Sequence, residues 1–196
     1  IHRLGYQVNT YARGLKAQQT FTAAIIVPDL INPFFALLVN YVEQVLAAVG
    51  YKLLVCNSHC NEDRELAYIN MAKQNKVDGL IAVTYSNTDE YLEADMPLVS
   101  IDRHFKHQIC CVSSDNEMGG RLAAQKFIDT GCKNVIYIRN GSNVEGETLK
   151  RGKAFVDTCE QGGVEATRMD FGEETTLSKQ QMNKINSFLE QCVKGG

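Results

Sequence analysis

This sequence of 196 residues lacks the long apolar runs and export signals that would place it in or across a membrane. No apolar stretch approaches the roughly 20 residues that a helix needs to cross a bilayer, which argues against a membrane protein. The first residues show no apolar core of a signal peptide, and the seven cysteines have no disulfide-like spacing. We therefore expect a cytoplasmic protein, whose reducing compartment keeps thiols free.

The motifs that hold nucleotides or activate a catalytic serine are also missing. The turn after the first predicted strand reads IVPDLINP and lacks the glycine-rich fingerprint of a dinucleotide site. The sequence contains neither a phosphate-binding P-loop nor the G-x-S-x-G turn of a serine hydrolase. A flavodoxin-like enzyme would need a cofactor loop or a paired acid and base, and neither is found. We therefore expect no enzymatic activity, no catalytic residues and no cofactor.

One short stretch, CNSHC at 56–60, brings potential metal ligands together in the sequence. Cys56, His59 and Cys60 lie within five residues. A metal site needs about four well-spaced ligands, and no second pair of cysteine or histidine has suitable spacing. We therefore predict no metal site and interpret the stretch as a strand end followed by a polar turn.

Acidic residues are missing from the beginning of the chain. The formal net charge of −3 argues against nucleic-acid binding by the chain as a whole. Residues 1–28 nevertheless contain Arg3, Arg13 and Lys16 and no Asp or Glu, so this part carries +3 and the remainder −6. The asymmetry indicates a polyanionic partner for the first residues alone, although a chance fluctuation in a short segment would look the same.

The hydrophobic pattern alternates short apolar runs with longer amphipathic stretches. This alternation predicts an α/β fold with a parallel, doubly wound sheet and helices on both faces. The expected strands are 22–27, 51–56, 78–83, 97–101, 108–114, 133–139 and 164–171, and the expected helices are 33–50, 61–75, 115–131, 146–163 and 177–193. A composition break near Gly162–Gly163 suggests a hinge between a first lobe and the following segment, which is too short for a core of its own.

Polar and aromatic residues gather where the predicted strands end. In open parallel sheets, ligands bind at the carboxyl ends of strands, next to the point where the strand order reverses. Charged groups and an aromatic face suit a polyhydroxylated ligand. Each residue also has a structural alternative, such as a turn cap, a core aromatic or an exposed ion pair. The candidates are Asp29, Phe34, Phe35, Asp102, Arg103, the turn at 140–142 and Arg151.

Several stretches in this order and spacing resemble the LacI/GalR family of bacterial transcription regulators. They are LGYQVNTYARGL (4–15), AAIIVPDLINPFFALLVNYVEQVLAAVGYKLLVCNS (23–58), VDGLIAV (77–83), PLVSIDR (97–103), SSDNEMGGRLAAQKFIDTGCKNVIYI (113–138) and RGKAF (151–155). The resemblance implies a two-lobed core like that of type I periplasmic sugar-binding proteins. It implies the end of a DNA-binding headpiece with a hinge helix at 1–20, a first lobe at 21–161 and an incomplete second lobe at 162–196.

By this resemblance, the first residues join a DNA-reading headpiece to the core. Asn9 would cap the hinge helix, Leu15 would wedge into the operator minor groove, and Ala12 would lie beside it. Arg13 and Lys16 would attract phosphates. A helix this short is marginal alone, so it should form only against its dimer mate and the groove. A disordered leader is the alternative interpretation of residues 1–20.

The resemblance also implies an effector site between the lobes. Phe34 would contact the effector and Arg151 would grip its hydroxyls or carboxylate, while Asp29, Asp102 and Met118 would lie near the cleft. Asp115 we interpret as a helix cap. The helix at 33–49 would form part of a homodimer interface, and effector binding would couple reciprocally to operator binding. We therefore expect an effector-responsive repressor that senses a small sugar or related metabolite; a periplasmic-type solute receptor is the alternative.

Overall fold

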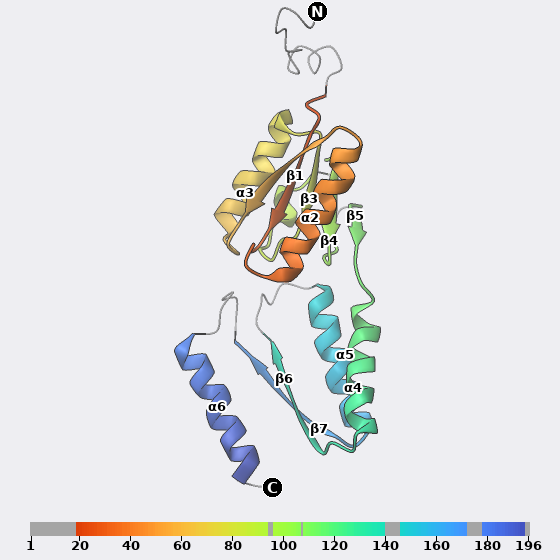
Figure 1. Ribbon diagram of the computed structural model, residues 1–196, viewed down its shortest axis with the longest axis vertical. Helices are drawn as coiled ribbons and strands as arrows, with labels where there is room; N and C mark the ends of the chain where they lie inside the picture. The colour runs from red at the N-terminus through yellow and green to blue at the C-terminus, as the bar shows by residue number, and fades with distance from the viewer. Residues whose placement is uncertain (1–18, 94–95, 107, 140–145, 172–177, 195–196) are drawn as a thin grey trace, which may run out of the picture. The chain divides into compact units, whose positions relative to one another are not determined.

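The computed structural model describes residues 19–93, 96–106, 108–139, 146–171 and 178–194, and its contacts divide into two compact units (Figure 1). The first unit runs to Ile101 and adds Phe105–Cys111, and the second consists of Asp102–His104 and Val112–Gly196. The predicted hinge helix, with Asn9, Ala12, Arg13, Leu15 and Lys16, lies outside the described residues.

The first unit is built on a sheet in the strand order β2-β1-β3-β4-β5. The pairs β1–β2, β1–β3 and β3–β4 are parallel, as the sequence predicts. Its elements are β1 (Thr22–Val27), α2 (Pro33–Ala48), β2 (Lys52–Asn57), α3 (Glu62–Met71), a π-helical turn (Ala72–Lys76), β3 (Gly79–Ala82), a 3-10 turn (Asp89–Tyr91), β4 (Leu98–Ile101) and β5 (Cys110–Val112).

The interior strand β1 is buried on both faces, because helices cover both sides of this sheet. Ile25 belongs to a core cluster with Phe35 of α2, whereas Ile26 belongs to a cluster with Ile69 of α3. Successive side chains of a strand point to opposite faces, so a continuous apolar run suits a strand between two helical layers. The doubly wound architecture is confirmed for this unit.

Short polar side chains start the helices. Asn32 Oδ1 accepts a hydrogen bond from the Phe34 amide at 3.0 Å, and Pro33 occupies the first turn of α2. Asp115 Oδ1 accepts from the Met118 amide at 2.8 Å, so its predicted role as a cap is confirmed. Such caps satisfy amides that have no partner inside the helix.

The second unit contains α4 (Asn116–Asp129), β6 (Asn134–Arg139), α5 (Glu147–Gln161), β7 (Glu165–Asp170) and α6 (Lys179–Lys194). Strands β6 and β7 form a parallel pair. Its core joins residues of α4, β6 and α5 to Val164, which directly precedes β7: Ala124, Val135, Phe155, Cys159 and Val164. Glycine at position 120 allows α4 and α5 to approach closely, since a Cβ there would overlap the α5 backbone.

The boundary between the units differs from the predicted first lobe at 21–161. Helices α4 and α5 and strand β6 belong to the second unit, and the chain changes units near residues 102 and 112. Gly162 and Gly163 instead end α5 inside the second unit. Gly163 has a φ of +73°, and its amide bonds to the Glu160 carbonyl. The predicted hinge is therefore a helix C-terminus with a left-handed glycine.

None of the helices in the described ranges is long and apolar enough to cross a membrane.

Candidate functional site

In the first unit, the carboxyl ends of β1 and β3 flank the point where the strand order reverses. Strand β2 lies on one side of β1 and β3 lies on the other. The loop after β1 contains Asp29, whose Oδ1 accepts a hydrogen bond from the Ile31 amide at 2.7 Å. Asp29 thus stabilises its own turn while standing at the position where open parallel sheets bind ligands.

Two consecutive phenylalanines open α2 and have different surroundings. Phe35 belongs to the core, whereas Phe34 is 53% exposed. Their rings meet edge to face, with centroids 5.2 Å apart and planes at 75°. Phe35 therefore holds the ring of Phe34 at this edge of the sheet, where an aromatic face could pack against the C–H face of a sugar.

Glu65 is a buried carboxylate at the same edge that the sequence interpretation missed. Its Oε1 accepts from Ser58 Oγ and the Tyr85 amide, both at 3.4 Å, and its Oε2 accepts from the Ser86 amide at 3.3 Å. Glu65 therefore joins the loops that follow β2 and β3. Its spacing was a usable signal, because Glu65 lies one helical turn before the buried Ile69.

In the second unit, Asp102 is held by its backbone and by its side chain. Its amide donates to the Val112 carbonyl at 3.0 Å, and its carbonyl accepts from the Glu147 amide at 3.2 Å. Its Oδ1 accepts from the Ser114 amide at 3.3 Å and from Asn116 Nδ2 at 3.4 Å. With a φ of +55°, Asp102 has a left-handed backbone that is uncommon outside glycine.

The residue after Asp102 is also part of the interior. Arg103 is only 3% exposed, so the alternative of an exposed Asp102–Arg103 pair is wrong.

Arg151 and Met118 are surface residues of the second unit. Arg151 lies on the exposed side of α5, and within the described part of the chain its guanidinium has no hydrogen bond or ion pair. Met118 lies in the first turn of α4 with an exposed side chain. A guanidinium without a protein partner keeps its fork of donors for a ligand. Of the predicted effector residues, Asp29 and Phe34 belong to the first unit, and Asp102, Met118 and Arg151 belong to the second.

An arginine–aspartate cluster at the carboxyl ends of β6 and β7 was also missed. Arg139 Nε donates to Asp170 Oδ1 and Arg168 Nε donates to Asp170 Oδ2, each at 2.8 Å. Burial would raise the pKa of Asp170, but the hydrogen bonds and charges of both arginines outweigh burial and lower it. Both Arg139 and Asp170 are the last residues of parallel neighbours, so their position at one sheet edge was predictable.

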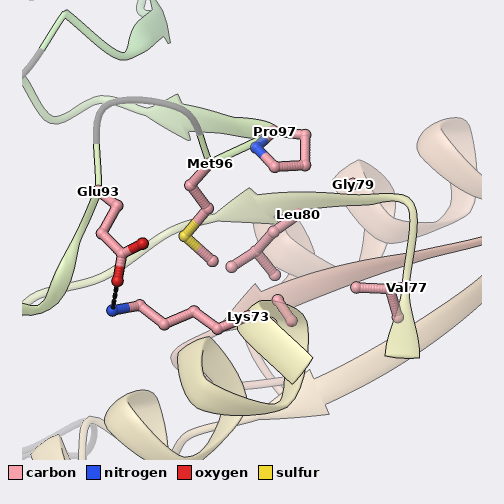
Figure 2. A pocket seen from close by; sticks show the side chains of 8 residues that line it. Lys73, Val77, Gly79, Leu80, Glu93, Met96 and Pro97 are labelled. Carbon is pink, nitrogen blue, oxygen red and sulfur yellow. Dashed lines mark hydrogen bonds and ion pairs between the residues drawn. The ribbon is translucent and has the colours of Figure 1, made fainter. Parts of the chain in front are cut away.

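A pocket of about 150 Å³ in the first unit lies away from these residues (Figure 2). Gly79 and Pro97 mark the amino ends of β3 and β4 in its lining. Lys73 Nζ and a Glu93 carboxylate oxygen form an ion pair at 2.7 Å beside it (Figure 2). The pocket therefore belongs to the opposite edge of the sheet from Asp29 and Phe34.

The stretch at 56–60 contains the end of β2 and a tight turn. His59 and Cys60 both have φ near +55°, and Cys56 is buried. In the ranges that the structure describes, no three cysteine, histidine or acidic side chains lie together as metal ligands would.

Comparison with known proteins relates most of the chain to one family. Residues 20–192 match the family described as periplasmic binding proteins and sugar binding domain of LacI family. A sucrose operon repressor of Streptococcus mutans is 34% identical over 162 residues, which are 82% of this chain and 51% of the repressor. A ribose operon repressor of Halalkalibacterium halodurans is 34% identical over 145 residues, which are 74% of this chain and 44% of that protein. The chain thus spans about half the length of the curated relatives it matches.

The fold also matches solved structures. The crystal structure of a periplasmic binding protein/LacI transcriptional regulator from Alkaliphilus metalliredigens, complexed with D-xylulofuranose, aligns with a TM-score of 0.73. The two sequences are 28% identical, and the alignment covers 84% of this chain and 63% of the other. The predicted periplasmic-binding-protein-like fold is confirmed.

Proposed function

Because the chain belongs to the family of periplasmic binding proteins and LacI-family sugar-binding domains, we propose that it is the effector-binding part of a transcriptional repressor that senses a small sugar. The observation that carries the proposal is the match over residues 20–192, together with relatives that are named sucrose and ribose operon repressors. These names favour a DNA-binding regulator in the cytoplasm over a periplasmic receptor. A repressor of this kind would bind its effector without changing it chemically.

Phe34 and Arg151 are the side chains that we propose for effector binding. Phe34 offers an exposed aromatic face at the carboxyl edge of the first sheet, and Arg151 offers guanidinium donors that bond to no other described residue of the chain. Asp29, Asp102 and Met118 support the site less directly, since Asp29 and Asp102 each use a carboxylate oxygen within the protein. A sugar needs hydrogen-bonding groups at its rim and an apolar face against its ring.

A homodimer is proposed through α2. Three apolar side chains recur every four residues along this helix and are exposed: Leu37 at 55%, Tyr41 at 62% and Val45 at 69%. Residues spaced by four form one stripe on a helix, and an exposed apolar stripe marks a protein interface. The stripe supports pairing of α2 with its copy in a second subunit.

Operator binding is proposed for residues 1–20. Leu15 would enter the minor groove beside Ala12, with Asn9 capping the hinge helix and Arg13 and Lys16 near phosphates. The test is fluorescence anisotropy with the full-length protein on duplexes from its own promoter region and on random duplexes of equal length. We expect a preference for one duplex that changes when sucrose, ribose or another sugar is added. Equal affinity for all duplexes at low salt would refute the proposal that the protein is a DNA-binding regulator.

The effector site is tested by calorimetry with a sugar found by thermal-shift screening. Arg151→Ala should weaken the sugar affinity at least about tenfold, because a charge-assisted hydrogen bond is lost. Arg151→Lys should recover only part of the sugar affinity, since an ammonium group lacks the two parallel donors of a guanidinium. Lys153→Ala, an exposed cation on the same helix, is the matched control and should leave the affinity unchanged. Equal losses for Arg151→Ala and Lys153→Ala would contradict the assignment.

The dimer is tested by sedimentation velocity. Val45→Glu places a charge on the apolar stripe and should produce monomers. Asn40→Glu introduces the same charge on an exposed part of α2 outside the stripe and should leave the dimer intact. A dimeric Val45→Glu variant would place the interface elsewhere.

A further inference from the structure

The carboxylate of Asp78 binds the residues through which the chain enters the first strand. Asp78 directly precedes β3, and Thr20 and Phe21 directly precede β1. Asp78 Oδ1 accepts from the Thr20 amide at 2.7 Å and from Thr20 Oγ1 at 2.8 Å, while Oδ2 accepts from the Phe21 amide at 2.8 Å. One carboxylate thus holds two consecutive backbone amides that lie 57 and 58 positions away in the sequence.

Residues at the start of β2 also contact this group of residues. The Phe21 ring packs edge to face on Tyr51, with centroids 5.7 Å apart. The Phe21 carbonyl accepts from the Lys52 amide at 2.9 Å, and the Tyr51 hydroxyl is near enough to Asp78 to help lower the pKa of that carboxyl. Asp78 therefore lies where the amino ends of three neighbouring strands, β1, β2 and β3, are joined.

The backbone at this point has an unusual conformation. Phe21 has a φ of +52°, in the left-handed region that bulky residues rarely adopt. Such a conformation persists only where surrounding contacts determine it. The contacts here are the bond to Asp78, the bond to Lys52 and the ring packing on Tyr51. They fix the direction in which the chain enters β1.

The protonation state of this group follows from its hydrogen bonds. Burial would raise the pKa of Asp78, but the hydrogen bonds from Thr20, Phe21 and Tyr51 outweigh burial and lower it. Burial and the Asp78 carboxylate raise the pKa of Tyr51. Asp78 is therefore an anion and Tyr51 a neutral donor at neutral pH.

We propose that Asp78 is a positioning residue that anchors the chain before β1 to the amino ends of the sheet, and so connects β3 to the DNA-binding segment. The role in DNA binding rests on the proposed function; the anchor itself does not. Strand β3 has four residues, about 13 Å at 3.3 Å per residue. At its other end, Glu65 holds the amides of Tyr85 and Ser86 at the edge proposed for the effector.

The geometry of β3 suits it to connect the two edges. Its neighbours β1 and β4 both pair with it in register, so its two ends are joined by a rigid element. A displacement of the loop at Tyr85 and Ser86 would reach Asp78 through four paired residues. The hydrogen bonds that Asp78 accepts would then shift Thr20 and Phe21, the residues that join the preceding segment to β1.

Hydrogen exchange tests the anchor without reference to DNA. In Asp78→Asn, one oxygen acceptor is lost, so the amides of Thr20 and Phe21 should exchange at least about tenfold faster. The Leu80 amide, which donates to Pro97, should keep its rate. Asp63→Asn removes an exposed carboxylate from α3 and is the matched control. If Asp78→Asn fails to fold, Tyr51→Phe is the second variant. It removes only one hydroxyl and should accelerate the exchange of the Thr20 and Phe21 amides by a smaller factor. Unchanged exchange of Thr20 and Phe21 overturns the proposal.

Operator affinity tests the connection in the full-length protein. Asp78→Asn should alter operator affinity, or its change on adding sugar, by a factor within the usual coupling range of about 5–150, while sugar affinity stays within about twofold of the wild type. Faster exchange with unchanged operator affinity and unchanged sugar response would overturn the proposal. If the wild type binds no duplex, the proposed function fails, and the exchange of Thr20 and Phe21 still decides whether Asp78 is the anchor.

Discussion

Replacing Gly120 by alanine should force α4 and α5 apart, because the added Cβ would meet the backbone of the facing helix. This Cβ would lie 3.0 Å from the Phe155 nitrogen and 3.2 Å from Ala154 Cβ, with the Arg151 carbonyl oxygen closer still. Ordinary carbon contacts are about 3.5–4.0 Å. Backbone atoms cannot rotate away, so one helix must move. Gly119 is the matched control, since no described atom lies within 4 Å of a Cβ there.

The two substitutions should therefore have opposite signs. Alanine favours a helix over glycine by about 0.5–1 kcal/mol, so Gly119→Ala should stabilise the second unit by that amount. Overpacking costs about 1–3 kcal/mol, and a clash with backbone belongs at the upper end. With the helix gain of alanine subtracted from this cost, Gly120→Ala should be about 2 kcal/mol less stable than the wild type. The two variants should differ by about 3 kcal/mol.

Thermal unfolding followed by circular dichroism measures this difference. At about 4–8 °C per kcal/mol for a domain of 60–100 residues, the melting temperatures should differ by roughly 12 °C or more. Faster amide exchange of Val135 in β6 would assign the loss to the second unit. Equal melting temperatures for Gly119→Ala and Gly120→Ala would refute the close helix packing.

Three further outcomes follow from buried and charged groups. The folded-state pKa of Asp170 is lowered, so its carboxylate contributes stability above about pH 4 that is lost as the pH falls through the folded pKa. Asp170→Asn should therefore reduce the loss of stability that urea unfolding measures between pH 7 and pH 3. A pH profile equal to that of the wild type would contradict this. Burial raises the pKa of Cys56 to about 11, so iodoacetamide should modify exposed Cys110 first and Cys56 only after unfolding, as mass spectrometry would detect; equal rates would disprove the burial. Glu65→Ala should cost about 3 kcal/mol in urea unfolding because it removes the carboxylate that accepts from Ser58 Oγ and from the Tyr85 and Ser86 amides, and Glu65→Gln should cost less; equal losses would argue against the hydrogen bonds.

Much of the secondary structure was predictable because its signals are local. Strand β1 begins and ends where its apolar run does, at Thr22 and Val27. Helix α4 begins after Asp115 and ends before Gly131, whose φ is +76°. Caps, glycine stops and apolar periodicity act over a few residues, so the sequence alone is sufficient to locate them.

The candidate site was predictable only in part. The positions of Asp29 and Phe34 after the first strand follow from the order of elements, and so does the exposure of Arg151 on its helix. The burial of Arg103 was not predictable, since charged residues are usually exposed and the exception depends on distant partners. For Glu65, the helical spacing to Ile69 indicated its face, but not the partners in the loops after β2 and β3.

What the sequence by itself determined is the alternation of strands and helices, the parallel fold class and the family, because these depend on periodicity and on motifs in a fixed order. Only the tertiary structure decided that α4, β6 and α5 belong to the second unit and not to the unit of the first sheet. It also decided that Phe21 and Asp102 take left-handed backbone conformations. The physical reason is that an amphipathic helix specifies that it must bury one face, but not which sheet will cover it. That choice depends on contacts between residues far apart, such as Gly120 with the backbone at Arg151 and Asp78 with the amide of Phe21.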